Sequence, residues 1–304
     1  MRLVAPAPEA RVEVDGKTLE LHHTDKVFWP DLGLTKADLI NYYLEVSPYL
    51  LPLLQGRPFI MRSFPNGIGG RSYYRWDLPD YAPAWLHRWP YEAKTGERVI
   101  DMLVIEGLPE LVWVANQAAI EMHPWLSRTD DPTHPDLVVF DLDPGPGLDF
   151  AGVLRVAAWL HDLLDELGLR GYPKTSGKEG LHVLVPVERR YTFREVRAWV
   201  QQVGRRLATA HPDAVTTDKA LARRKGRVLV DYSQNGLGKS IASAYSARAT
   251  PNAAVSTPLT WREVTAGKVR PGDFTLLTMP KRLRKVGDLL ARLVEGQKLP
   301  ALEG

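Results

Sequence analysis

Cysteine is absent from this 304-residue chain, which excludes a disulfide framework and any zinc site built on thiolates. The chain also lacks the ~20-residue apolar run that a membrane span requires. Its start, MRLVAPAPEA, has no apolar core of the kind found in signal peptides. The net charge is only +3, and so small an excess favours a nucleic-acid partner only slightly. We therefore expect a cytoplasmic protein with no membrane partner.

Three common nucleotide and hydrolase motifs are missing as well. The sequence contains no Gly-x-Gly-x-x-Gly, no Walker P-loop and no Gly-x-Ser-x-Gly elbow. Hydrophobic content of 44% and charged content of 25% are ordinary for a globular protein with a core. The length allows one large domain or two intimate ones. We expect one domain, 1–304, in which the polar linker SRTDDPTHPD separates a module at 11–125 from a module at 126–304.

Hydrophobic periodicity predicts an ordered series of elements. Residues 11–22 alternate around Asp15-Gly16, which indicates a hairpin. Thr35 and Asp38 form a helix start signal, and it is followed at helical spacing by Leu39, Tyr42, Tyr43, Val46 and Leu50. Further predicted helices are 111–122, 150–167, 193–210 and 280–295, and further predicted strands are 58–62, 137–142, 181–187 and 227–232. The second half thus alternates strands and helices, which predicts a mixed α/β (α+β) fold with a sheet covered by helices.

The stretch VVFDLDPGPG ends an apolar strand with two aspartates, Asp141 and Asp143. Residues two apart on a strand face the same side, so the two carboxylates repel and raise each other's pKa. A divalent cation such as Mg²⁺ or Mn²⁺ relieves this repulsion by taking oxygens from both. The alternative is a strand end whose aspartates serve the turn. Asp231 ends a second alternating strand, and two-metal phosphoryl transfer commonly needs about three acidic ligands.

The stretch KTSGKEGLHVLVPV opens a glycine-rich turn directly into a strand. Glycines let backbone N–H groups approach an anion, so Ser176, Lys178 and His182 are candidates for contact with a triphosphate. The alternative is a purely structural turn. A basic loop nearby carries Lys219, Arg223 and Arg224 close to Asp231 in sequence, and these residues suit phosphate neutralisation. For each of them alone, a solvated surface side chain is the simpler reading.

Two further groups suit nucleic acid. Lys26 and Lys36 flank an aromatic turn at a helix start, where an anion binds favourably, although two surface lysines explain the spacing equally simply. Aromatic residues interleaved with arginine suit base stacking combined with backbone contacts, whereas a small aromatic core is the alternative. The members named in this group are Arg62, Phe64, Tyr73 and Tyr74.

Taken together, these stretches resemble the polymerase domain of bacterial ATP-dependent DNA ligase D, within the archaeo-eukaryotic primase superfamily. The resemblance rests on TDKVFWPDLGLTK, RSFPNG, WVANQAAIEMH, VVFDLDPG, TSGKEGLHVLVPV and VDYSQNGLGKSIASAYSARA, in family order over about residues 20–250. It implies a catalytic sheet related to the RNA-recognition fold, packed with an N-terminal α/β module. It also implies primer extension, often with ribonucleotides, during double-strand break repair, with manganese as the favoured metal.

The resemblance implies a role for each matching residue. Asp141, Asp143 and Asp231 match the catalytic, metal-binding triad. One of two ions, held by all three, would activate the primer 3′-hydroxyl, and the other, held by Asp141 and Asp143, would bind the triphosphate. The residues that match nucleotide contacts are Ser176, Lys178, His182, Arg248 and His123. Many members read Ser-Gly-x-Lys-Gly-Leu-His, whereas here Lys178 comes one residue earlier and Glu179 takes the other place.

Lys26 and Lys36 match the lysines that hold a DNA 5′-phosphate, and Tyr73 and Tyr74 match aromatics against the template base. The expected function is therefore metal-dependent primer extension at gaps and double-strand breaks in non-homologous end joining. The expected partners are 5′-phosphorylated DNA, nucleoside triphosphates, and possible Ku-like and DNA ligase proteins; on DNA the protein would associate with the nucleoid. A primase, a non-catalytic DNA-end binding module and a metal-dependent phosphohydrolase are the alternatives.

Overall fold

The chain forms two compact units, and it passes from one to the other several times. The computed structural model describes residues 4–92 and 98–302. Unit 1 holds the residues up to 125 together with 240–255 and 275–284, and unit 2 holds 126–239, 256–274 and the segment from 285 onward. The sequence-based division at residues 125 and 126 coincides with the first of these boundaries, but it does not anticipate that the chain returns twice to unit 1. Within the described residues, no helix is long and apolar enough to cross a membrane.

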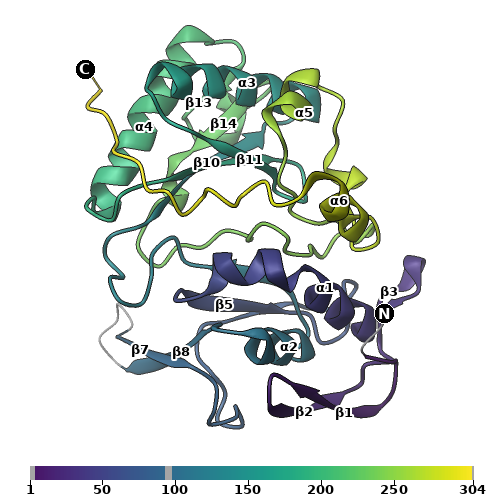
Figure 1. Cartoon of the computed structure of the whole chain (residues 1–304). Coiled ribbons are helices and arrows are strands. Elements are labelled where there is room, and N and C mark those ends of the chain that lie inside the picture. Colours follow the sequence, from purple (N-terminus) through teal and green to yellow (C-terminus); the bar gives the residue numbers. More distant parts are fainter. Residues whose placement is uncertain (1–3, 93–97, 303–304) are drawn as a thin grey trace. The chain divides into compact units, whose positions relative to one another are not determined.

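Unit 1 is built on a mixed set of short strands and two main helices (Figure 1). Its elements are β1 (Glu9–Val14), β2 (Lys17–His22), β3 (Val27–Trp29), β4 (Leu34–Thr35), α1 (Lys36–Leu54), β5 (Pro58–Ser63), β6 (Tyr73–Arg75), β7 (Arg88–Glu92), β8 (Val99–Val104), α2 (Leu108–Asn116) and β9 (Ala119–Pro124), and α6 (Met279–Val286) begins in it. Strand β5 organises the sheet, because it pairs antiparallel with β6, β8 and β9.

Local sequence explains how α1 begins and which face it buries. Thr35 accepts a hydrogen bond from the backbone N–H of Asp38, whose carboxylate accepts in return from the backbone N–H of Thr35. This capping box confirms the predicted helix start. The residues predicted to line its apolar face are all buried, and they are Leu39, Tyr42, Tyr43, Val46 and Leu50. The predicted hairpin is confirmed as β1 and β2.

Two predicted helices are wrong at their C-terminal ends. The helix expected over 111–122 stops at Asn116, and Ala118, with φ of 59°, turns the chain into strand β9. Helical spacing of apolar residues does not exclude a short buried strand, because β9 is buried on both sides and shows no alternation. The helix expected over 280–295 ends at Val286, where Gly287 has φ of 68°.

Unit 2 has a strand–helix–strand–strand–helix–strand core. Its elements are β10 (Leu137–Pro144), α3 (Phe150–Glu166), β11 (Tyr172–Thr175), β12 (Leu181–Pro186), α4 (Phe193–Ala210), β13 (Val215–Thr216), β14 (Val228–Asp231) and α5 (Trp261–Ala266). The strands lie in the order β11-β12-β10-β14-β13, antiparallel except for the pair β13 and β14. This is the ferredoxin-like arrangement, which the RNA-recognition fold shares, so the predicted α/β sheet is confirmed.

Helices α3 and α4 cover one face of this sheet (Figure 1, teal to green). The side chains on that face are apolar and fully buried, for example Phe140, Leu142 and Val230. Because successive side chains on a strand point to opposite faces, the residues between them lie on the face away from the helices. The sheet therefore presents Asp141, Asp143 and Asp231 on its other face.

Candidate active site and nucleic-acid contacts

One row of polar side chains crosses four strands of unit 2. The register places Lys174 on β11 opposite His182 on β12, His182 opposite Asp141 on β10, and Asp141 opposite Asp231 on β14. Asp143 follows two residues along β10 and shares the face. Lys174 and Asp231 are 57 positions apart in the sequence, and the strand pairing is what brings them into one row. The sheet thus assembles three carboxylates, one imidazole and one ammonium in one place.

The three carboxylates differ in their electrostatics. Burial, together with the neighbouring charge of Asp141, raises the pKa of Asp143 to about 6, whereas Arg224 opposes the shift. For Asp231, burial acts to raise the pKa, but hydrogen bonds from Ser233 and Lys219 outweigh burial and lower it. The Lys219 ammonium lies 2.9 Å from Asp231 Oδ1, and the Ser233 backbone N–H donates to the same oxygen at 2.8 Å.

The carboxylate set fits a divalent cation. Asp143 resists ionisation because like charge is close and water is partly excluded, and a cation removes both penalties by accepting oxygens from the carboxylates. Among the described residues, however, no three acidic or histidine side chains already converge tightly enough to enclose an ion. Asp231 is instead held by Lys219, so an ion shared by all three aspartates would exchange with that ammonium.

Lys174 is a member of the site that sequence analysis missed. It is fully buried, and its Nζ lies 2.8 Å from His182 Nδ1 and 2.7 Å from Ser256 Oγ. An ammonium at Lys174 would donate to Nδ1, and the ring proton of His182 would then sit on Nε2. His182 Nε2 in turn lies 3.3 Å from Asp141 Oδ1. The only signal in the sequence was a lysine two residues before Ser176, at the start of the glycine-rich turn.

Ser176 shapes the turn between β11 and β12. Its Oγ accepts from the backbone N–H groups of Lys178 at 3.2 Å and Gly180 at 3.1 Å, so these two amides close the turn and do not form an outward-facing nest. Lys178 and Glu179 are exposed and line a cavity of about 630 Å³. A Cβ on Gly180 would lie 2.7 Å from the carbonyl oxygen of Leu142, so glycine is required where this turn crosses β10.

The predicted basic loop closes over the end of β10. Gly145 N–H donates to Arg227 O at 2.8 Å, and a Cβ on Gly145 would lie 1.7 Å from the carbonyl oxygen of Arg224. The Arg224 guanidinium approaches Pro144 O at 3.4 Å. Arg223 is exposed and pairs with Asp218 at 3.5 Å. The Pro-Gly run after the aspartates therefore serves to seat the basic loop beside them.

Unit 1 gathers a second set of predicted residues around Glu121, which sequence analysis did not select. Glu121 Oε2 accepts from Arg62 Nη1 at 2.8 Å and lies 3.1 Å from His123 Nε2, and Oε1 lies 3.3 Å from Arg248 Nε. All four side chains are buried or half-buried. Because the helix predicted over 111–122 is wrong there, the i, i+2 relation that puts Glu121 and His123 on one strand face could not be read.

The predicted aromatic residues differ in their exposure to solvent. Phe64 is buried, whereas Tyr73 and Tyr74 are about half exposed, so they are not part of an aromatic core. The Arg62 guanidinium lies 5.1 Å from the ring centroids of both Phe64 and Tyr74. Tyr74 also stacks on exposed Trp76, with ring centroids 5.8 Å apart. Tyr74, and not Tyr73, is therefore the ring held by the arginine cluster.

The two predicted phosphate lysines lie next to each other at the start of α1. The backbone N–H of Lys36 donates to Lys26 O at 2.9 Å. Lys26 is exposed and its Nζ donates to Asn66 Oδ1 at 2.7 Å, whereas Lys36 is buried and its Nζ donates to His22 O at 2.6 Å. Burial, together with the charge of Lys26, lowers the pKa of Lys36 to about 8. Lys26 is thus the exposed lysine of the pair, and Lys36 is buried and less basic than an ordinary lysine.

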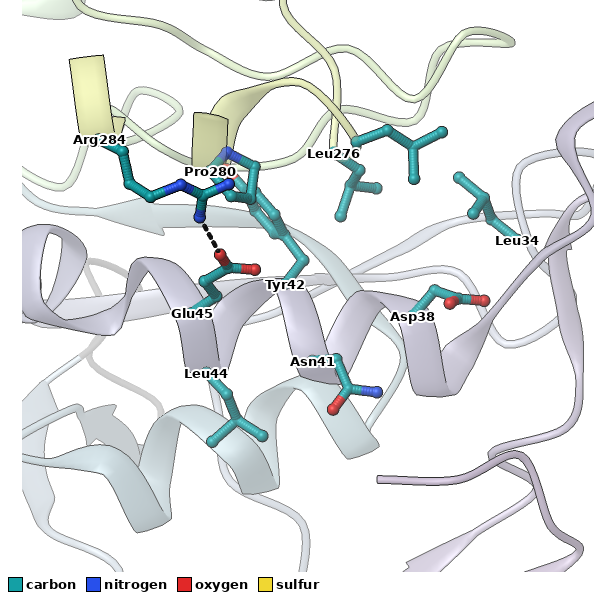
Figure 2. A pocket seen from close by; sticks show the side chains of 10 residues that line it. Leu34, Asp38, Asn41, Tyr42, Leu44, Glu45, Leu276, Pro280 and Arg284 are labelled. Atoms are coloured by element: carbon teal, nitrogen blue, oxygen red, sulfur yellow. Dashed lines mark hydrogen bonds and ion pairs between the residues drawn. The ribbon is translucent and has the colours of Figure 1, made fainter. Parts of the chain in front are cut away.

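A separate cavity of about 470 Å³ lies in unit 1, between α1 and residues 276–284 (Figure 2). Arg284 and Glu45 form an ion pair of 3.0 Å at its rim. None of the predicted site residues lines it.

The family model of the LigD primase-polymerase domain matches residues 35–290. The chain is 34% identical to the multifunctional non-homologous end joining protein LigD of Mycolicibacterium smegmatis, over 90% of this chain and 36% of that protein. It is 33% identical to the bifunctional non-homologous end joining protein LigD of Bacillus subtilis, over 88% of this chain and 43% of that protein. The chain thus spans less than half the length of these curated relatives.

A solved structure is similar over nearly its whole length. The polymerase domain of Mycobacterium tuberculosis Ligase D, in complex with DNA, superimposes with a TM-score of 0.85 at 32% identity. The match covers 92% of this chain and 99% of that one.

Proposed function

The chain belongs to the LigD primase-polymerase family, and from that premise we propose that it is a metal-dependent nucleotidyltransferase that extends primer 3′ ends on a DNA template. Its substrates in this proposal are gaps and double-strand breaks, and its pathway is non-homologous end joining. The single observation that carries the proposal is the row of Lys174, His182, Asp141 and Asp231 across four strands, with Asp143 beside it.

In this proposal Asp141, Asp143 and Asp231 hold two Mn²⁺ or Mg²⁺ ions. Bound there, the ions would supply charge neutralisation at the triphosphate and would lower the pKa of the primer 3′-hydroxyl. The protein's own contribution is to keep the carboxylates on one rigid sheet face, so that little reorganisation is needed when a nucleotide binds. Lys219 Nζ lies 2.9 Å from Asp231 Oδ1, so an ion held by Asp231 would compete with that ammonium, which would then suit a phosphate.

His182 has a defined part in binding the nucleotide. Nδ1 lies 2.8 Å from Lys174 Nζ, and Nε2 lies 3.3 Å from Asp141 Oδ1, so a bound nucleotide would draw the Nε2 proton from that carboxylate to a triphosphate oxygen. Lys178, exposed on the turn that Ser176 closes, adds positive charge. The assignment of His123 and Arg248 to the nucleotide rests on the family resemblance, together with the excess positive charge of their cluster.

The proposed DNA contacts form three groups, two in unit 1 and one in unit 2. Lys26 and Lys36, at the N-terminus of α1, suit a recessed 5′-phosphate, because two ammonium groups and a helix N-terminus favour the same anion. Arg62 and Tyr74 suit a template base, since an exposed ring held over a guanidinium offers a stacking face. In unit 2, Lys219, Arg223 and Arg224 suit the primer or template backbone. A Ku-like end-binding protein and a DNA ligase are the proposed partners.

The test is extension of a gapped duplex that carries a 5′-phosphate at the downstream end. We expect incorporation with Mn²⁺, none with a chelator, and none from Asp141→Ala, which should still bind the 5′-phosphorylated duplex. Parallel reactions with ribo- and deoxynucleotides measure sugar preference. Retained extension by Asp141→Ala would refute the metal assignment.

Further reactions with other substrates separate the alternative functions. Products from an unprimed single strand would indicate a primase. Release of hydrolysed nucleotide without a primer would indicate a phosphohydrolase. Tight binding of DNA ends without incorporation under any metal would indicate a binding module.

A further inference from the structure

We infer that Glu121 is a positioning residue that holds Arg62, His123 and Arg248 in one cluster and so sets the contacts they make with template and nucleotide. The inference rests on the proposed function, because that function gives those three residues their ligands. None of the sequence motifs assigns a role to Glu121 itself.

Each of the two carboxylate oxygens of Glu121 has two polar partners. Oε2 accepts from Arg62 Nη1 at 2.8 Å and lies 3.1 Å from His123 Nε2. Oε1 lies 3.3 Å from Arg248 Nε and accepts from the backbone N–H of Ala249 at 3.3 Å. These partners come from three separate segments, β5, β9 and the chain at 248–249. One buried side chain therefore fixes three parts of the unit relative to each other.

The charge of the cluster suits an anionic ligand. Burial acts to raise the pKa of Glu121, but the hydrogen bond from His123 and the charge of Arg248 hold that pKa well below its usual range. Burial lowers the pKa of His123, which favours its neutral form. Two guanidinium groups against one carboxylate leave the cluster with excess positive charge. Stability alone does not explain a buried ion cluster, because well-packed apolar residues in its place often stabilise a protein equally or more.

Paired residues on three neighbouring strands connect the buried cluster to the exposed ring of Tyr74. The register places Tyr74 on β6 opposite Arg62 on β5, and Arg62 opposite Glu121 on β9. The Tyr74 ring lies over the Arg62 guanidinium, and its edge meets His123 with ring centroids 6.0 Å apart. Tyr74 is 46% exposed, so a shift in the buried carboxylate changes the angle at which this ring meets a base.

The experiment compares Glu121→Gln with a matched control, Glu110→Gln, by steady-state extension of the gapped duplex. Glu110 is also buried in unit 1 and its Oε1 lies 2.7 Å from His87 Nδ1, but it contacts none of the assigned site residues. We expect kcat/KM for the nucleotide to fall about 10- to 100-fold in Glu121→Gln, since misplacement by ~1 Å can cost ~100-fold. In Glu110→Gln it should stay at the parent value, although both variants lower Tm.

A conservative variant decides the case if Glu121→Gln does not fold. Glu121→Asp keeps the charge but withdraws the carboxylate, so we expect a loss smaller than that of Glu121→Gln and an altered nucleotide KM. Parent kinetic constants in folded Glu121→Gln, or in Glu121→Asp where Glu121→Gln does not fold, would overturn the inference and leave Glu121 as part of the fold only. An inactive parent protein would instead overturn the proposed function, before any variant is compared.

Discussion

Replacing Lys174 by methionine isolates the part that a buried ammonium plays in orienting His182. Methionine keeps an unbranched stem in a fully buried position but cannot donate to Nδ1. The lost contact is a 2.8 Å hydrogen bond from a charged donor, and such bonds contribute about 1.5–3 kcal/mol. At 1.4 kcal/mol per tenfold, the preference for the tautomer with its proton on Nε2 falls about 10- to 100-fold. We expect kcat/KM for the nucleotide to fall by a similar factor.

The assay is a double-mutant cycle measured by primer extension. His182→Ala alone removes the imidazole that Lys174 orients, so adding Lys174→Met to it should cause little further loss. Ser256→Ala, which removes another hydrogen-bond partner of Lys174 at 2.7 Å, should cause a smaller loss because the bond to His182 remains. Nitrogen-15 NMR of the His182 ring gives a readout independent of activity. The parent should show one tautomer, and Lys174→Met should show a mixture.

Two results would refute this reasoning. Equal losses from Lys174→Met in the parent and in the His182→Ala background would show that the lysine acts elsewhere. A His182 ring that keeps its tautomer in Lys174→Met would show that something other than the ammonium sets the position of the proton.

The remaining predictions concern DNA contacts. Lys26→Ala should weaken binding of DNA with a recessed 5′-phosphate, measured by fluorescence anisotropy, and equal affinities of the parent for phosphorylated and unphosphorylated ends would exclude the assignment. Because burial lowers the pKa of Lys36 to about 8, its charge is present below pH 8 and is lost as pH rises through 8. Preference for the 5′-phosphate should therefore decline between pH 7 and 9 and become pH-independent in Lys36→Arg; an unchanged decline in Lys36→Arg would assign the titration to another group. Tyr74→Ala should reduce affinity for primed template by about 5- to 100-fold, the ~1–3 kcal/mol of one stacked base. Tyr73→Ala should have a smaller effect, and the reverse order would show that the arginine-held ring is not the stacking face.

The same lowered pKa has a consequence for stability. The folded pKa of Lys36 lies below its ordinary value of 10.5, so burial penalises the charged form. The penalty is fully present below pH 8 and is relieved as pH rises from 8 toward 10.5. Burial of the charged Lys36 lowers the stability of the fold, and contact of this charge with an anionic ligand would explain why the lysine is present.

Local signals were sufficient where one short segment decides the outcome. The capping residues and apolar spacing of α1 predicted its start and its buried face, because both depend on residues three or four apart. The hairpin of β1 and β2 followed from its turn in the same way. Residues 119–122 were assigned to a helix because a strand buried on both faces shows no alternation. That error concealed Glu121, the centre of the buried cluster.

By itself the sequence determined the carboxylates at two strand ends, the α/β class and the resemblance that led to the family, since these depend on residue identity and order. Only the tertiary structure decided that Lys174, His182, Asp141 and Asp231 lie in one row, because strand register is set by pairing between segments distant in sequence. It also decided that Lys36 is buried while Lys26 is exposed, and that Tyr74 rests on Arg62. Burial and partner distance change pKa and orientation, and neither quantity is a property of one residue or its neighbours along the chain.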